Sequence, residues 1–234
     1  MATFILVPGA WLGGWCWDDV AQLLRAAGHG VITVTLTGLA ERAHLLTTEI
    51  GLDTHVGDVA DILVGEDLGD AILVGHSYGG TVIASVAERV PERLRCLVFL
   101  DASVPDDGQS NNDTLPPELV AMIRESAHRG GDGWRVPPPA PTDWRLDEEL
   151  RARLTPHPLR SLEQPAALRS AASRRVRRAF LRTSPPTSFY QQILERARVD
   201  GWYWRELEGG HYAMITAPLV VATALIELER QGAR

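Results

Sequence analysis

In the first hundred residues of this 234-residue chain, short apolar runs alternate with stretches of helical periodicity, and this alternation limits the fold most strongly. The apolar runs are rich in Val, Ile and Leu, as expected of strands buried on both faces, and they cover 4–7, 31–36, 71–74 and 97–100. The helical stretches between them cover 17–27, 55–64 and 80–90. Buried strands joined by helices predict an α/β protein with a doubly wound, mostly parallel sheet.

The alternation stops after Asp101 and resumes near residue 179. The stretch between them holds Pro pairs, the run Pro137-Pro138-Pro139 and a loosely helical segment at 148–154. We therefore expect one domain, with a core formed by 1–104 and 176–234 and a small cap insertion, 105–175, lying over the sheet. Within the second part of the core, the pattern predicts strands at 179–183 and 203–207 and helices at 188–198 and 218–230.

Composition argues against several classes of protein. The net charge of −7 disfavours nucleic acid as the main partner, and no apolar run reaches the roughly 18 residues of a membrane span. The first residues lack the basic region of a signal peptide, and two cysteines are too few for a disulfide framework. No Cys/His cluster has the spacing of a zinc site, so that neither a metal nor another cofactor is expected. These features predict a cytoplasmic protein.

The segment Gly75-His76-Ser77-Tyr78-Gly79 has the form G-x-S-x-G. As a string it is weak evidence, but it follows the strand expected at 71–74 and opens the helix expected at 80–90. A nucleophile elbow requires this strand–turn–helix setting. Small glycines at both ends allow a cramped turn that lifts the serine hydroxyl above the sheet. Ser77 is therefore the expected nucleophile.

A serine hydroxyl is a poor nucleophile until a base removes its proton, and His211 is the expected base. It lies between the last expected strand and the last expected helix. Because the carboxyl ends of parallel strands share one edge of the sheet, this turn can face Ser77. Acyl transfer also needs donors for the developing oxyanion, and we assign the backbone N–H groups of Ala10 and Tyr78 to that role.

Together these motifs resemble the plant methylesterase and hydroxynitrile lyase branch of the α/β-hydrolase superfamily and its bacterial esterase relatives. The segments that carry the resemblance are 9–17, 36–45, 74–80 and 209–211. The resemblance implies the α/β-hydrolase fold and the hydrolysis of small carboxylic esters. It also places Ser77 and His211 in the catalytic roles of the family.

The chain departs from this family at two positions. Members usually carry the acid of the triad a few residues past the strand that is here 179–183, where this chain has no carboxylate. Asp101, at the end of the strand that follows the nucleophile strand in the chain, is our candidate, with a capping role as the alternative. Plant lyases of this branch carry a lysine next to the histidine, where this chain has Tyr212, and the chain contains no lysine at all. Cyanohydrin cleavage by that route is not expected.

Aromatic side chains near these motifs suggest an apolar substrate pocket, with plain core packing as the alternative. The candidates for the pocket wall are Trp11, His76, Trp134 and Tyr212, with Trp144 as a further aromatic residue of the cap. A cluster of arginines either docks an acidic partner or substrate or forms a solvated face; its members are Arg169, Arg174, Arg175, Arg177, Arg178 and Arg182.

The favoured hypothesis is a serine hydrolase that cleaves a small carboxylic ester through an acyl-enzyme on Ser77. One alternative is an enzyme that tailors polyketides or other secondary metabolites, as a thioesterase, cyclase or cofactor-free oxygenase, because one scaffold can host all of these reactions. A second alternative is a small-molecule receptor without catalysis. We expect a small-molecule ester as the partner, neither nucleic acid nor a membrane, and we consider a homodimer.

Overall fold

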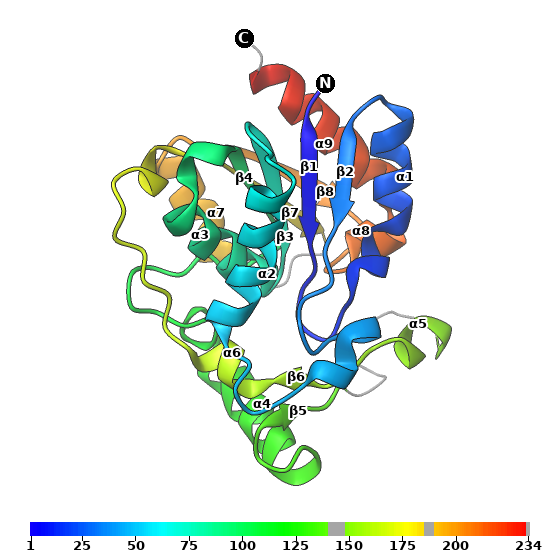
Figure 1. Cartoon of the computed structure of the whole chain (residues 1–234), viewed down its shortest axis with the longest axis vertical. Helices are drawn as coiled ribbons and strands as arrows, with labels where there is room; N and C mark the ends of the chain where they lie inside the picture. Colours follow the sequence, from blue (N-terminus) through cyan, green and yellow to red (C-terminus); the bar gives the residue numbers. More distant parts are fainter. Residues whose placement is uncertain (140–147, 185–189, 233–234) are drawn as a thin grey trace.

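Six parallel strands form the central sheet of the computed structural model, which describes residues 1–139, 148–184 and 190–232 (Figure 1). Their order across the sheet is β2-β1-β3-β4-β7-β8. The bounds are Thr3–Val7 (β1), Gly30–Thr33 (β2), Ala71–His76 (β3), Leu94–Leu100 (β4), Arg177–Ser184 (β7) and Tyr203–Glu208 (β8). All six expected strands are confirmed. The second is shorter than predicted, because the chain leaves the sheet after Thr33 and buries Leu36 in a loop.

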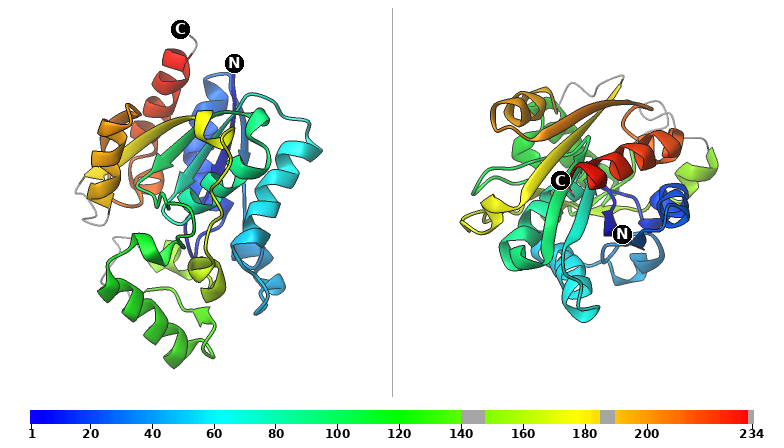
Figure 2. Two further views of the ribbon diagram at one scale, coloured as in Figure 1. Left: turned by 90° about the vertical axis from the view of Figure 1, so that its left-hand side faces the viewer. Right: turned by 90° about the horizontal axis from the view of Figure 1, so that it is seen from above.

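Helices cover both faces of this sheet, as the two further views show (Figure 2). One face packs against α1 (Asp18–Ala26) and α9 (Pro218–Gly232), and the other against α2 (Leu52–Gly65), α3 (Gly79–Arg89) and α7 (Gln191–Val199). Successive residues of each strand point to opposite faces, so the central strands β1 and β3, which are covered on both sides, are almost entirely apolar. In β1, Phe4 and Leu6 join the core on the α1 side, whereas Ile5 and Val7 join the core on the α2 side. The doubly wound architecture is therefore confirmed.

The expected helices agree with the observed ones to within a few residues. The one predicted at 188–198 corresponds to α7, and residues 188 and 189 lie outside the described part of the chain. The remaining short elements of the core are α8, Ala213–Thr216, and the 3-10 helices Gly14–Trp17, Ala40–Leu45 and Pro91–Arg93. Two further 3-10 helices, Asn112–Thr114 and Ser173–Arg175, lie between β4 and β7.

Between β4 and β7 the chain leaves the sheet and forms a cap over the carboxyl ends of the strands (Figure 1). The cap contains α4 (Pro117–Gly130), the hairpin of β5 (Arg135–Val136) and β6 (His157–Pro158), α5 (Glu148–Ala152) and α6 (Leu159–Glu163). We had not predicted α4. Its signals are present in the sequence, since a proline stands in its first turn and Ile123 and Ala127, four residues apart, are buried.

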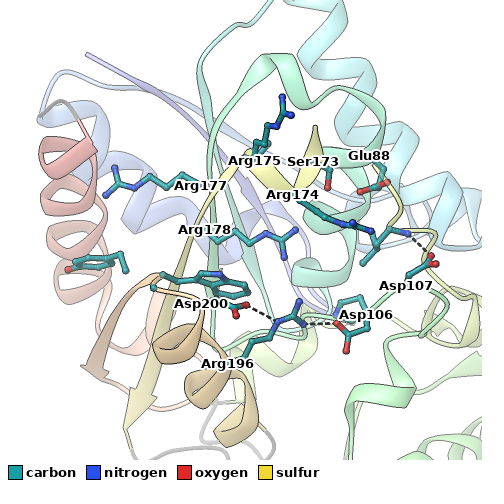
Figure 3. A pocket seen from close by; sticks show the side chains of 16 residues that line it. Glu88, Asp106, Asp107, Ser173, Arg174, Arg175, Arg177, Arg178, Arg196 and Asp200 are labelled. Atoms are coloured by element: carbon teal, nitrogen blue, oxygen red, sulfur yellow. Dashed lines mark hydrogen bonds and ion pairs between the residues drawn. The ribbon is translucent and has the colours of Figure 1, made fainter. Parts of the chain in front are cut away.

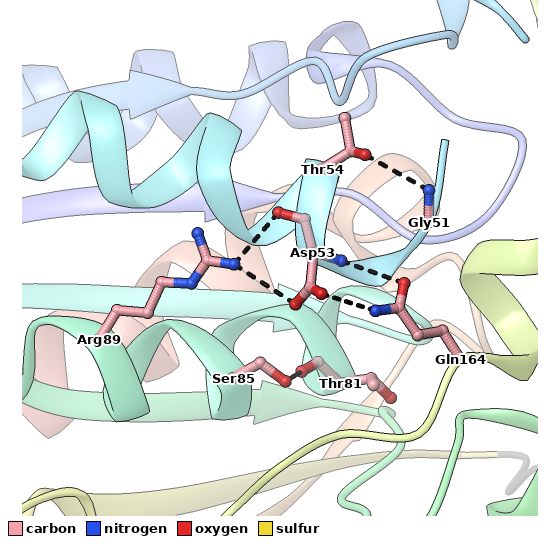
Figure 4. Close-up of polar contacts among 7 residues, drawn as sticks. All are labelled: Gly51, Asp53, Thr54, Thr81, Ser85, Arg89 and Gln164. Carbon is pink, nitrogen blue, oxygen red and sulfur yellow. Dashed lines mark hydrogen bonds and ion pairs between the residues drawn. The ribbon is translucent and has the colours of Figure 1, made fainter. Parts of the chain in front are cut away.

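The end of α6 is hydrogen-bonded to the first turn of α2 (Figure 4). The side chain of Gln164 accepts from the N–H of Asp53 at 3.4 Å and donates to its carboxylate at 2.7 Å. Arg89 of α3 pairs with the same carboxylate at 3.3 Å. A negative side chain at a helix N-terminus is favourable, and here it also joins the cap to the core.

The order of the strands fixes where a site can form. From β1 the chain runs to β2 on one side, whereas β3 and all later strands of the sheet lie on the other side. The crevice outside the carboxyl ends of β1 and β3 is therefore a topological switch point, where open α/β sheets bind their ligands. None of the helices described here is long and apolar enough to cross a membrane.

Candidate active site

Ser77 lies in the sharp turn between β3 and α3, half-buried at the switch point. Its φ of 52° is in the left-handed region, which non-glycine residues rarely adopt. Hydrogen bonds hold this strained backbone: the N–H of Ser77 donates to Leu100 at 3.3 Å, and its carbonyl accepts from Gly80 at 3.0 Å. At Gly79 an added Cβ would lie 2.7 Å from the carbonyl oxygen of Pro8. The glycine is needed because the turn after β1 passes directly against the elbow.

The structure joins His211 to Asp101. Nδ1 of His211 donates to Oδ2 of Asp101 at 2.7 Å, across 110 positions of sequence. The Asp101 side chain is completely buried, while that of His211 is 16% exposed. A carboxylate only accepts hydrogen bonds, so Nδ1 carries a proton, and the neutral form of this tautomer has its lone pair on Nε2, where imidazole acts as a base.

A second histidine, His76, holds the backbone of His211. Its Nε2 donates to the carbonyl oxygen of His211 at 2.8 Å, and the two rings lie 4.6 Å apart. Burial holds the pKa of His76 well below its usual value, and the nearby His211 lowers it further. The ring is therefore neutral. The side chain of His76 is only 1% exposed. It therefore supports His211 from within the core and does not face an open pocket, whereas the sequence analysis expected it in the pocket wall.

Tyr190 is a residue of this centre that the sequence analysis missed. Its ring stacks on that of His211 at 6.3 Å, and its hydroxyl lies next to the side chains of Ser77 and Ser103. Burial and the negative charge of Asp101 raise the pKa of Tyr190 to about 12, so the hydroxyl keeps its proton. The available signal was position: Tyr190 follows β7, whose carboxyl end lies at the same edge of the sheet as the elbow.

The turn after β1 lies against the nucleophile. An added Cβ on Gly9 would lie 2.9 Å from Cβ of Ser77, so this backbone approaches the serine as closely as a chain can. In the described part of the chain, no hydrogen bond from the N–H of Ala10 or Tyr78 to a turn or loop carbonyl is present. The assignment of these two groups as oxyanion donors stays a prediction.

The other residues expected in the wall of the substrate pocket lie in different places. Trp11 is 8% exposed and lies under the cap, where its indole N–H donates to the carbonyl of Val136 at 3.0 Å. Tyr212 is 5% exposed and packs against the rings of His76 and His211, and burial raises its pKa. Trp134 lines a separate hollow of about 430 Å³ on the cap. Trp144 lies outside the described residues. Packing thus explains Trp11 and Tyr212 better than contact with an open cavity.

The arginine cluster lies away from Ser77, along the side of β7 (Figure 3). Arg174, Arg175, Arg177 and Arg178 line a hollow of about 700 Å³. Carboxylates share this hollow, and several neighbouring arginines are paired with them: Arg196 with Asp106 at 2.9 Å and Asp200 at 3.4 Å, and Arg169 with Asp107 at 3.0 Å. The cluster is therefore part of a mixed charged surface. Among the described residues, no group of three or more His, Cys, Asp or Glu side chains could hold a metal ion.

Comparisons with known proteins agree with this architecture. The model of the alpha/beta hydrolase family matches residues 4–224. A carbendazim hydrolyzing esterase of Nocardioides sp. is 36% identical over 97% of this chain and 100% of its own length. Methylesterase 1 of Arabidopsis thaliana is 36% identical, but over only 48% of this chain and 43% of its own.

Solved structures show the same fold. An extracellular alpha/beta-hydrolase from a Paenibacillus species superposes with a TM-score of 0.86 at 24% identity, covering 97% of this chain and 98% of its own. A methylesterase from Arabidopsis superposes with a TM-score of 0.70 at 22% identity, covering 98% and 99%. The chain therefore belongs to the α/β-hydrolase family, as a carboxylic ester hydrolase of the branch that holds the plant methylesterases and their bacterial esterase relatives.

Proposed function

We propose that the protein hydrolyses a small carboxylic ester in two acyl-transfer steps, with Ser77 as nucleophile, His211 as general base and Asp101 as the residue that orients the base. The observation that carries this proposal is the 2.7 Å contact between Nδ1 of His211 and the buried carboxylate of Asp101. This contact leaves Nε2 of His211 free of a proton on the side of the ring away from Asp101. Tyr190, which touches both Ser77 and His211, ties the nucleophile to the base.

In the first step Nε2 of His211 takes the proton of the Ser77 hydroxyl as Oγ attacks the ester carbonyl carbon. The carbonyl oxygen becomes an oxyanion, and the N–H groups of Ala10 and Tyr78 donate to it. His211 then gives the proton to the alcohol oxygen, which leaves, and the acyl group stays on Ser77. In the second step His211 activates a water molecule, whose attack releases the carboxylic acid and restores the serine.

Asp101 acts on the charge of the base. When His211 holds the proton of Ser77 it is an imidazolium, and the adjacent carboxylate stabilises that charge. The same contact fixes the ring in the tautomer that leaves Nε2 as an acceptor. An aspartate at the end of β4 can thereby orient the base. Members of the family usually place the acid for this role after the strand that corresponds to β7.

The test is hydrolysis of short- and medium-chain p-nitrophenyl esters, and of carbendazim, the compound named for the Nocardioides relative. We expect Ser77→Ala to fall to the background rate. Asp101→Asn, which offers His211 an amide in place of a carboxylate, should lower kcat by about 10³- to 10⁴-fold. Asp106→Asn is the matched control, because Asp106 lies on the surface just beyond the same strand and pairs with Arg196.

Other outcomes would contradict the proposal in distinct ways. Turnover that does not depend on Ser77 but is lost in His211→Ala would favour the cyclase or oxygenase alternative. Saturable ligand binding without turnover, and without labelling of Ser77 by a fluorophosphonate, would favour a receptor.

We also infer a cytoplasmic location and a small-molecule partner instead of nucleic acid, and we consider a homodimer. Cys16 and Cys96 are both free and buried, which supports a reducing compartment. The net charge of −7 supports the absence of a nucleic-acid partner. Fractionation of the source cells and light scattering of the purified protein test these points.

A further inference from the structure

A row of buried polar side chains connects the turn after β1 to α2 by way of the cap. The backbone N–H of Trp11 donates to Nδ1 of His157 in β6 at 3.4 Å. Nε2 of His157 lies 2.9 Å from the hydroxyl of Ser161 in α6. The ring of His157 also packs edge-on against that of Tyr78, with the ring centres 4.9 Å apart, and the hydroxyl of Tyr78 lies 2.8 Å from Nδ1 of His55 in α2. We call these five residues the cap relay.

The proton positions along the cap relay follow from its two ends. At one end, Nε2 of His55 lies 3.0 Å from the carbonyl oxygen of Thr37, which only accepts, so Nε2 carries the proton. Burial lowers the pKa of His55 to about 4, so the ring is neutral and its Nδ1 accepts from the hydroxyl of Tyr78.

At the other end, the N–H of Trp11 only donates, so Nδ1 of His157 accepts. Burial holds the pKa of His157 well below its usual value, and the neutral ring therefore donates through Nε2 to Ser161. The hydroxyl of Ser161 in turn donates to the carbonyl of Pro158, 2.9 Å away. Each hydrogen-bond donor of the cap relay is thus paired with an acceptor.

Trp11 is the strained member of this relay. Its φ of 65° lies in the left-handed region, which is rare for a bulky side chain. Two contacts hold it there, the N–H bond to His157 and the indole bond to the carbonyl of Val136 at 3.0 Å. Val136 and His157 are partners in the β5–β6 hairpin, so both contacts come from one element of the cap. The carbonyl of Trp11 also accepts from the N–H of Thr155, another residue of the cap, at 3.1 Å.

The turn after β1 and the nucleophile elbow are therefore both attached to the cap. Trp11 directly follows Ala10, and the side chain of Tyr78 belongs to the residue that directly follows Ser77. The backbone N–H groups of Ala10 and Tyr78 are the two oxyanion donors of the proposed function. A donor displaced by a fraction of an ångström loses much of its effect on the transition state.

We propose that His157 is a positioning residue for the oxyanion site: it holds the turn of Ala10 through the N–H of Trp11 and the elbow through the ring of Tyr78. This inference rests on the proposed function and assigns the cap a part in the chemical step. It predicts that damage to the cap relay lowers kcat, whereas a change confined to a binding surface would raise KM.

The experiment compares three substitutions of His157 in the full-length protein. Phenylalanine removes both polar contacts, asparagine keeps an acceptor near the place of Nδ1, and glutamine keeps a polar group near the place of Nε2. We expect His157→Phe to lower kcat by about 10- to 100-fold, less than or equal to the loss of a whole oxyanion donor, with KM within about threefold of wild type. His157→Asn should recover most of this loss, because the Trp11 contact survives. His128→Gln, an exposed histidine of α4, is the control.

A second readout separates positioning from general weakening of the fold. A trifluoromethyl ketone forms a tetrahedral adduct on the serine with a charged oxygen, so its Ki should rise by the same factor by which kcat/KM falls across the series. If His157→Phe does not fold, Ser161→Ala supplies the comparison, because it removes the hydroxyl bonded to Nε2 of His157 and leaves the bond from Trp11 to Nδ1 in place.

The outcomes are distinguishable. A folded His157→Phe enzyme with wild-type kcat, a loss confined to KM, or a ketone Ki that does not follow kcat/KM would overturn the role of His157 alone. A wild-type protein without Ser77-dependent hydrolysis would overturn the proposed function and this inference with it.

Discussion

The carboxylate of Asp101 lies 2.7 Å from Nδ1 of His211 and is the buried partner of that imidazole. Asp101 has a φ of 42°, and its N–H donates to the carbonyl of Leu181 in β7 at 2.8 Å. The neighbouring strand thus fixes the backbone of the aspartate in a turn that aims its side chain at the histidine. This relationship explains how the chain can lack a carboxylate directly after the residues of β7 and still provide an acid for the base.

Replacing Tyr190 by phenylalanine should lower kcat/KM by about 3- to 10-fold, the kinetic equivalent of one lost hydrogen bond. The substitution removes the hydroxyl that contacts Ser77 and Ser103 and leaves the ring stacked on His211. Steady-state kinetics on a p-nitrophenyl ester measure the effect. Tyr203→Phe, on β8, is the matched control and should retain wild-type rates; an unchanged Tyr190→Phe enzyme would rule out a role for the hydroxyl.

The support that His76 gives to His211 predicts a loss of both stability and activity in His76→Phe. The substitution leaves the carbonyl of His211 without its 2.8 Å donor in a buried place, which should cost about 1–3 kcal/mol of unfolding free energy. Urea unfolding measures this cost. His76→Gln can still donate a hydrogen bond and should recover part of the loss, whereas equal loss in both variants would indicate that packing alone matters.

The free energy of unfolding should fall as the pH drops below about 6.5. The pKa of His55 is about 4 in the folded protein and has a usual value of 6.5, so between these values the unfolded chain binds more protons. From pH 7.5 to pH 5, His55 alone should remove about 2 kcal/mol of stability. The lowered pKa values of His76 and His157 act in the same direction.

Chemical unfolding at a series of pH values tests this dependence. His55→Asn keeps an acceptor for Tyr78 but cannot titrate in this range, so its stability should depend less steeply on pH. A wild-type stability that is constant from pH 7.5 to pH 5 would contradict the buried, neutral state of these histidines.

The contact between the cap and α2 predicts a modest effect for Gln164→Ala. The variant loses both hydrogen bonds between Gln164 and Asp53 (Figure 4), so its free energy of unfolding should be about 1 kcal/mol lower than that of the wild type. Gln191→Ala is the control, since within the described ranges the side chain of Gln191 bonds to its own helix, to Glu195 at 3.2 Å. Equal unfolding free energies for the two variants would mean that the contact adds no stability.

Much of the core could be predicted because its signals are local. The strands of the sheet are apolar runs, and Ser77 stands where a strand meets a helix; both features are written in consecutive residues. The elements of the cap could not be predicted in this way. Its helix α4 shows only Ile123 and Ala127 as fully buried apolar residues, and its hairpin is two residues long on each side, too short for a periodic pattern.

The sequence by itself determined the fold class and predicted the nucleophile and the base, because strand and helix periodicities and the elbow motif depend on neighbours in the chain. The tertiary structure alone decided which groups surround Ser77. Asp101 and His211 meet across 110 positions, and His157 reaches Trp11 across 146. Such contacts arise when parallel strands bring their carboxyl ends to one edge and the cap folds over it. No local pattern encodes those distances, because they result from how the whole sheet and the cap pack together.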